Sequence, residues 1–178
     1  AVELWNGEGN IAGLPSREDE PLPFKPEDID ENKQALREWK WAAREIYDTN
    51  ARRKSKTVAT SLTIWLARKF SKHPKIWFPF TLDWRGRAYA APPYLNPQGT
   101  DLAKGLLEFG TTRPIESQEQ ADWLLVHVAN TWGEDKCSLE DRIAWTLKNS
   151  KRIIETAKDP FNDMWWTEAD KPWSFLAG

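Results

Sequence analysis

The 178-residue chain has a formal net charge of −2, with 40% hydrophobic and 29% charged residues, a composition that suits a packed core. It contains no apolar run near the ~18 residues that a membrane-spanning helix needs, and its first residues do not resemble a signal peptide. The one cysteine cannot form an internal disulfide, and with only two, widely separated histidines a Cys/His zinc site is not expected.

Charge is distributed unevenly along the chain. Residues 1–32 contain nine acidic and two basic side chains, whereas residues 50–82 contain no acidic side chain. The basic residues of this second stretch are Arg52, Arg53, Lys54, Lys56, Arg68, Lys69, Lys72 and Lys75. Such a local basic field attracts polyanions such as nucleic acid, although the same pattern also suits the solvated face of a helix.

Residues 1–26 are predicted to form an extended connector, because glycines and prolines interrupt any regular period. A helical pattern begins at Glu27, where acidic residues after Pro26 favour a helix N-terminus, and it ends by Pro74. Apolar residues recur at helical spacing in two stripes, which predict two long helices or one long broken helix. The stripes are Leu36, Trp39, Ala43 and Ile46, followed by Val58, Leu62, Trp65, Leu66 and Phe70.

Residues 75–112 are expected to contain short strands and turns. The segments 76–78 and 87–90 are short and aromatic, and glycine and proline residues punctuate them, which favours a small sheet. Residues 106–109 are predicted to form another short strand.

The helical period returns in residues 113–178. Ser117 and Gln120 have the spacing of a capping box. The buried face of the helix that follows is predicted to comprise Leu124, Leu125, Val128 and Ala129. Ser138 is predicted to cap a further helix that ends before Pro160.

The segment most suggestive of chemistry is Asp83-Trp84-Arg85-Gly86-Arg87. A glycine between two arginines lets backbone and guanidinium groups approach a phosphate together, and the planar guanidinium matches phosphate oxygens in pairs. Asp83 is expected to form an ion pair with one arginine and to leave the other free. Taken alone, the pattern also describes an ordinary turn with a surface ion pair.

A second turn is predicted at residues 96–101, Asn-Pro-Gln-Gly-Thr-Asp, with Lys104 just beyond it. Together with residues 80–89, this stretch closely resembles the single-subunit RNA polymerases of podovirus-type bacteriophages. Mitochondrial RNA polymerases are more distant relatives in the same resemblance, which extends over residues 20–177.

The resemblance implies an α+β, mainly helical part of a right-hand polymerase. Residues 27–74 would be thumb-like basic helices, and residues 75–112 would be the start of the palm, with its D-x-x-G-R element. Residues 113–178 would be a helical palm insertion that stops before the catalytic aspartate motif. The parent protein would be a DNA-directed RNA polymerase, a nucleotidyltransferase that transcribes phage genes.

The same resemblance assigns contacts with nucleic acid. The residues implied to contact the template strand and the RNA:DNA hybrid are Asp83, Arg85, Gly86, Arg87, Tyr89 and Lys104. The residues expected to add auxiliary basic contacts are Arg52, Arg53, Lys54 and Lys56.

Catalysis in the family is expected to use Mg²⁺ held by paired carboxylates. The chain has neither the Asp-Gly nor the His-Asp pair in which the family carries them, so no catalytic or metal-binding residue is assigned. The isolated chain is therefore predicted to be inactive and to bind no cofactor. The implied partners of the parent are DNA template, RNA:DNA hybrid and ribonucleoside triphosphates. The parent is expected to be a monomer, away from membranes, in the cytoplasm of the infected bacterium.

Two other interpretations stay open from the residues alone. A non-catalytic nucleic-acid-binding module would use the basic stretch and some of the twelve tryptophans to hold phosphates and bases. A helical protein-interaction domain would use exposed tryptophans instead. A reading frame that continues into Asp-Gly and His-Asp motifs would favour the polymerase.

Overall fold

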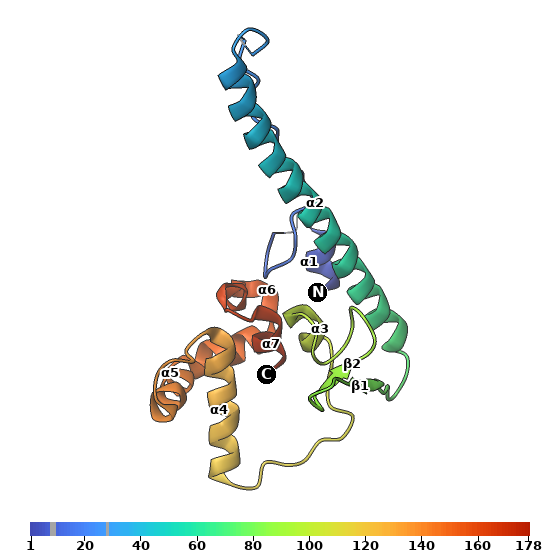
Figure 1. The fold of residues 1–178 in the computed structure, drawn as a ribbon. Helices are drawn as coiled ribbons and strands as arrows, with labels where there is room; N and C mark the ends of the chain where they lie inside the picture. Colours follow the sequence, from blue (N-terminus) through green and yellow to red (C-terminus); the bar gives the residue numbers. More distant parts are fainter. Residues whose placement is uncertain (8–9, 28) are drawn as a thin grey trace. The chain divides into compact units, whose positions relative to one another are not determined.

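The computed structural model describes residues 1–7, 10–27 and 29–178, and over these ranges the chain is mainly helical with one two-stranded sheet (Figure 1). The α+β, mainly helical class expected from the sequence is confirmed. The chain divides into two compact units, Ala1–Leu62 and Thr63–Gly178, which are described separately. None of the helices in these ranges is long and apolar enough to cross a membrane.

The first unit contains the short helix α1 (Val2–Asn6), a segment without regular structure, and most of the long helix α2 (Lys33–Phe70). Helix α2 begins at Lys33 because Asn32 caps it: the side-chain oxygen of Asn32 accepts the backbone N–H groups of Gln34 and Ala35, each at 3.1 Å. The predicted helix start at Glu27 is therefore wrong, and the neighbouring Asp28 lies outside the described residues.

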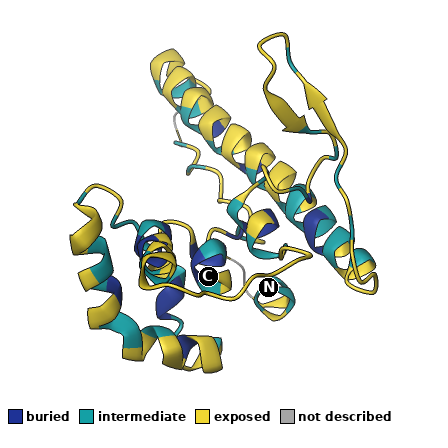
Figure 2. Cartoon of the chain, turned by 90° about the horizontal axis from the view of Figure 1, so that it is seen from below, coloured by how far each residue is buried: buried dark blue, intermediate teal, exposed yellow. Residues whose placement is uncertain are grey.

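Helix α2 is a single helix of 38 residues, which decides between the two alternatives left open by its apolar stripes. The helix is continuous because no glycine or proline interrupts residues 33–70. Arg68 and Lys69 lie in its last turn, where positive charge favours the helix C-terminus. Much of its surface is exposed, and Figure 2 shows buried positions only at intervals along it.

The sheet in the second unit is an antiparallel hairpin of β1 (Phe80–Leu82) and β2 (Ala88–Ala90), with Thr81 opposite Tyr89. Strand β2 agrees with the strand predicted at 87–90, whereas β1 begins after the predicted segment 76–78. The strand predicted at 106–109 is wrong, because the backbone N–H of Leu106 instead bonds to Leu102 at the end of helix α3 (Asp101–Gly105). Both hairpin strands are largely exposed (Figure 2).

Helices α4 (Gln118–Trp132) and α5 (Leu139–Lys158) pack against each other in the second unit. Both predicted serine caps are confirmed, since the Ser117 hydroxyl accepts from Gln120 N at 3.3 Å and that of Ser138 from Asp141 N at 3.1 Å. The predicted buried face of α4 is only partly right. Val128 and Ala129 are buried as predicted and Leu125 is half-buried, but Leu124 is exposed, and Val126, which was not predicted, is buried.

An aromatic cluster closes the C-terminal part of the second unit around η1 (Trp165–Glu168), which follows α6 (Pro160–Asp163). The Trp132 and Trp165 ring centroids lie 4.3 Å apart, and Phe175 of α7 (Pro172–Ala177) meets Trp165 edge-on at 5.5 Å. The Arg152 guanidinium lies 4.5 Å from the Trp165 ring centroid. Part of the tryptophan content therefore forms core.

Helices α3 and α7 approach closely, and two residues of α3 make this possible. The Asp101 carboxylate accepts the backbone N–H groups of Trp173 at 2.8 Å and Ser174 at 3.1 Å, and the Ser174 hydroxyl at 2.5 Å. At Gly105, a β-carbon would lie 2.5 Å from the carbonyl oxygen of Trp173. Only glycine leaves room for this packing.

Replacing Gly105 with alanine should separate α3 from α7 and destabilise the second unit. Overpacking of this kind costs about 1–3 kcal/mol, which outweighs the usual gain from a Gly→Ala change in a helix. Gly110→Ala is the matched control, since its added β-carbon meets nothing closer than 3.9 Å. Chemical unfolding of the 178-residue chain measures the difference. Equal free energies of unfolding for the two variants would show that α3 and α7 can move apart without loss of stability.

Candidate nucleic-acid interface

The D-x-x-G-R segment forms the turn of the β1–β2 hairpin. The Gly86 backbone N–H bonds to the Asp83 carbonyl at 3.0 Å and closes a β-turn, and the Asp83 N–H bonds to the Arg87 carbonyl at 3.0 Å. Gly86 has a φ of +76°, a left-handed conformation that disfavours residues with a β-carbon. A three-residue loop with glycine in this conformation is a common hairpin connection.

The Asp83 carboxylate holds the backbone of the turn. Its Oδ1 atom accepts the backbone N–H of Arg85 at 2.8 Å and that of Arg87 at 2.9 Å, and Tyr89 donates its hydroxyl to Oδ2 at 3.4 Å. The predicted ion pair between Asp83 and an arginine is therefore wrong, because the amides of the tight turn lie closer to the carboxylate than either guanidinium does. Across the described residues, no ion pair reaches Asp83.

This arrangement leaves both guanidinium groups available. Arg85 and Arg87 are exposed, and in the described parts of the chain neither side chain forms a hydrogen bond or an ion pair. The Arg85 guanidinium lies over the Trp84 ring, 4.5 Å from its centroid, and Trp84 is itself 87% exposed. Stacking of this kind orients the guanidinium plane and leaves its N–H edges open to an acceptor.

Gln98 connects the hairpin to the second turn, and sequence reasoning did not single it out. Its side-chain oxygen accepts the Ala90 N–H at 2.7 Å, and its side-chain nitrogen donates to the Ala88 carbonyl at 2.8 Å. The amide thus pairs with the outer edge of β2 as a neighbouring strand would. A glutamine inside a short turn was the only signal in the sequence, since its partners lie up to ten residues away.

Lys104 is exposed on α3, in the same unit as the hairpin. Thr100 caps this helix by accepting the Ala103 N–H at 3.3 Å. Within the described ranges the Lys104 side chain has no hydrogen bond or ion pair, so its charge is unshielded. In those ranges, no hydrogen bond or ion pair joins it to the turn at residues 83–87.

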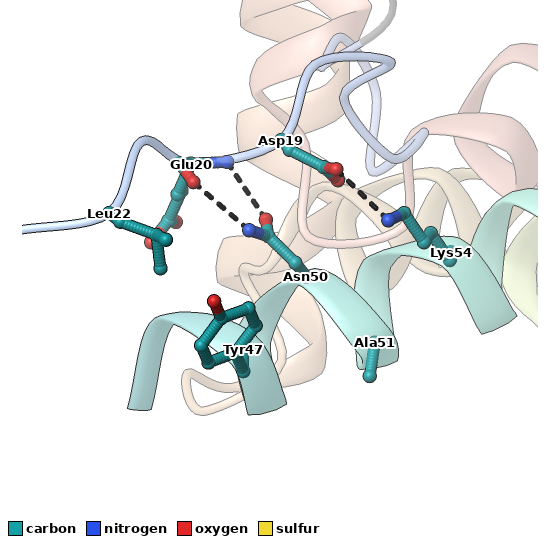
Figure 3. Close-up of a pocket in the computed structure, with 7 residues that line it drawn as sticks. All are labelled: Asp19, Glu20, Leu22, Tyr47, Asn50, Ala51 and Lys54. Atoms are coloured by element: carbon teal, nitrogen blue, oxygen red, sulfur yellow. Dashed lines mark hydrogen bonds and ion pairs between the residues drawn. The ribbon is translucent and has the colours of Figure 1, made fainter. Parts of the chain in front are cut away.

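The other predicted basic residues belong to the first unit, where a segment that we call the strap, residues 16–23, runs along α2. Asn50 binds the strap backbone twice: its side chain accepts from Glu20 N at 2.8 Å and donates to Glu20 O at 3.0 Å (Figure 3). Trp39 donates its ring N–H to the Pro23 carbonyl at 3.0 Å. These contacts run in opposite order along the two segments, so the strap lies antiparallel to α2.

The strap also engages two of the four auxiliary basic residues. Arg53 donates to the carbonyls of Ser16 at 2.8 Å and Arg17 at 3.1 Å and forms an ion pair with Asp19, which Lys54 also approaches at 3.0 Å. Hydrogen bonds from Lys54 and Arg53 lower the pKa of Asp19 below its usual value of 3.8. The ion pairs of Asp19 with Arg53 and Lys54 are therefore fully formed above pH 3.8 and are lost as the pH falls through the lowered pKa.

Arg52 and Lys56, the remaining two, are exposed and have no side-chain partner in the described ranges. The structure thus divides the four auxiliary residues into a shielded pair and an open pair.

No group of three or more His, Cys, Asp or Glu side chains in the described ranges is placed to hold a metal ion. Two carboxylates of this unit already accept backbone hydrogen bonds: Asp83 in the hairpin turn and Asp101 from the first turn of α7. The described residues therefore do not fit a Mg²⁺ site.

Comparison with known proteins agrees with the resemblance to phage RNA polymerases that the D-x-x-G-R segment suggested. Residues 115–178 match the profile of the family described as DNA-dependent RNA polymerase. Over 167 residues the chain is 46% identical to the DNA-directed RNA polymerase of Enterobacteria phage T3 and 43% identical to T7 RNA polymerase of Escherichia phage T7. Each alignment covers 94% of this chain and 19% of the relative.

Over 94% of its length, the chain is similar to a segment of the single-subunit RNA polymerases of bacteriophages. The resemblance to single-subunit phage polymerases is confirmed, and it extends to an organellar relative. This is DNA-directed RNA polymerase 2, chloroplastic/mitochondrial, of Arabidopsis thaliana, 37% identical over 177 residues that cover 98% of this chain and 17% of the relative. The chain spans less than a fifth of the length of these polymerases. Because the alignments cover at least 94% of the chain, they include the hairpin and Gln98, which lie in the middle of the chain.

Substitutions of Asp83 distinguish the effect of the hydrogen bonds that its side chain accepts from the effect of its negative charge. Asp83→Ala removes the acceptor of two backbone N–H groups and should destabilise the turn by about 1.5–3 kcal/mol, the range for hydrogen bonds to a charged group. Asp83→Asn keeps a side-chain oxygen at the same place and should cost much less. Hydrogen exchange of the Arg85 and Arg87 amides reports the effect. If Asn is as damaging as Ala, the carboxylate charge matters more than these hydrogen bonds.

Proposed function

We propose that this chain is part of a DNA-directed RNA polymerase that extends RNA on a DNA template from ribonucleoside triphosphates. In this proposal the Arg85–Gly86–Arg87 turn contacts the template strand and the RNA:DNA hybrid. One observation supports the proposal most directly. The guanidinium groups of Arg85 and Arg87 are exposed on a hairpin turn that Asp83 and Gly86 hold in place, and neither has an acidic partner in the described residues.

The chemistry of the turn suits phosphate better than a protein carboxylate or an apolar partner. Guanidinium groups bind phosphate oxygens in pairs, and the missing β-carbon of Gly86, which has nothing within 4 Å of that position, lets a backbone approach. Tyr89 lies on β2 next to the turn, and the unshielded Lys104 adds positive charge in the same unit. Arg52 and Lys56 are proposed to add weaker contacts from α2.

The family architecture gives each part of the chain a place in this proposal. Helix α2 would belong to the thumb, the β1–β2 hairpin to the start of the palm, and helices α4 to α7 to an insertion within the palm. The polymerase would use Mg²⁺ held by carboxylates outside this chain, because the described residues do not fit such a site. It would act as a monomer in the cytoplasm of the infected host.

The isolated 178-residue chain is expected to synthesise no RNA. Nucleotidyl transfer by two metal ions needs closely placed carboxylates, and the described acidic residues form no such group. The measurement is incorporation of labelled ribonucleotides on a primed DNA template with Mg²⁺, with a full-length phage polymerase as the positive control. Templated incorporation by the purified chain would contradict the assignment of catalysis to residues elsewhere.

In the full-length polymerase, Arg87→Ala should impair transcription more than Lys72→Ala. Arg87 is fixed on the hairpin turn, whereas Lys72 is an exposed lysine just after α2 with basic neighbours that can replace it. A charge-assisted hydrogen bond contributes about 1.5–3 kcal/mol, so retention of the hybrid should fall about tenfold or more. The loss should appear as early release of short RNAs.

The ratio of full-length to abortive transcripts measures this effect, after circular dichroism shows that both variants fold. Lys72→Ala controls for loss of one positive charge. A wild-type ratio for Arg87→Ala would mean that the turn is structural and that the proposed contact is wrong.

A further inference from the structure

The strap places an acidic side chain where a nucleic-acid phosphate would bind α2. Asp19 contacts both Arg53 and Lys54, and residues 50–82 contain no acidic side chain that could shield these cations from within that stretch. A carboxylate and a phosphate diester both accept hydrogen bonds from the same ammonium and guanidinium groups. Asp19 and a polyanion therefore cannot both occupy Lys54 fully.

The two cations differ in how firmly the strap holds them. The Arg53 side chain is only 14% exposed, and it also donates to the carbonyls of Ser16 and Arg17. Lys54 is 64% exposed, and Asp19 is the one partner of its ammonium group in the described ranges. An exposed ion pair of this kind is weak and exchanges readily, so Lys54 can change partners while Arg53 stays with the strap.

The strap does not depend on Asp19 for its position. Asn50 binds the Glu20 backbone through two hydrogen bonds (Figure 3). In addition, Trp39 donates to the Pro23 carbonyl, and Arg53 donates to two strap carbonyls. Removing the Asp19 charge should therefore free Lys54 without detaching the strap. This separation makes the role of the charge testable by itself.

We propose that Asp19 is an internal competitor for nucleic-acid phosphate at Lys54, so that the strap lowers the affinity of this part of α2 for single-stranded RNA or DNA. The proposal rests on the nucleic-acid contacts of α2 in the proposed function and adds an autoinhibitory contact to them. While Asp19 occupies Lys54, a polyanion along α2 has one cation fewer to bind, and removal of the Asp19 charge makes that cation available.

Asp19→Asn in the 178-residue chain tests this, with Glu18→Gln as the matched control. Glu18 lies next to Asp19 on the strap and carries the same charge, but its side chain has no partner in the described ranges. The measurement is fluorescence anisotropy of a single-stranded RNA oligonucleotide between about 50 mM and about 200 mM salt. Circular dichroism checks that each variant keeps its helix content.

Asp19→Asn is expected to bind RNA about fivefold more tightly at about 0.1 M salt, and to steepen the slope of log K against log salt by about 0.7, the value for one added phosphate contact on a single strand. Glu18→Gln should show a smaller gain and an unchanged slope. Equal gains from the two variants would overturn the proposal, because they would reflect net charge alone. An unchanged affinity of Asp19→Asn would overturn it too.

Lys54→Ala completes the test. It should change RNA affinity little in the wild-type chain, where Asp19 already occupies the ammonium group, and should abolish the gain in the Asp19→Asn background. A fivefold loss from Lys54→Ala alone would overturn the proposal, and this result does not require the Asp19 variant to fold. If no variant binds RNA, the nucleic-acid role of α2 in the proposed function is refuted. If every variant binds RNA with the affinity of the wild-type chain, only the role of Asp19 is refuted.

Discussion

The hydrogen bonds that Asp101 accepts from the first turn of α7 are the interaction on which the rest of the second unit depends. They join residues more than 70 positions apart and allow Gly105 to lie against the Trp173 backbone. The hairpin is attached close to the same point, because Gln98 pairs with β2 and lies two residues before Thr100, the cap of α3. The orientation of the arginine turn is therefore linked to the aromatic core through a continuous series of short contacts.

Features set by neighbouring residues could be predicted from the sequence, and features set by distant partners could not. The serine caps of α4 and α5 and the turn around Gly86 follow from local chemistry. Asn50 and Gln98 looked unremarkable, because a side-chain amide does not show which backbone it will bind. The sequence even suggested the wrong partner for Asp83, since charge alone favours an arginine side chain over a backbone amide.

The family resemblance supplied what local chemistry could not, namely that residues 80–89 and 96–107 act together. The structure adds the physical connection, which is a glutamine side chain that extends the sheet by one position. The number of charges in the sequence did not show which of the basic residues are free to bind a partner. The basic stretch from Arg52 to Lys56 looks uniform in sequence, yet the strap divides it into shielded and open cations.

The continuity of α2 has a mechanical consequence. A helix of 38 residues is about 57 Å long at 1.5 Å per residue, and it contains no proline or glycine at which it could bend. A tilt of about 5° at its Phe70 end would move its Lys33 end by about 5 Å, close to one full helical turn. Small changes in the direction of the helix axis would thus become large displacements of the residues at its far end.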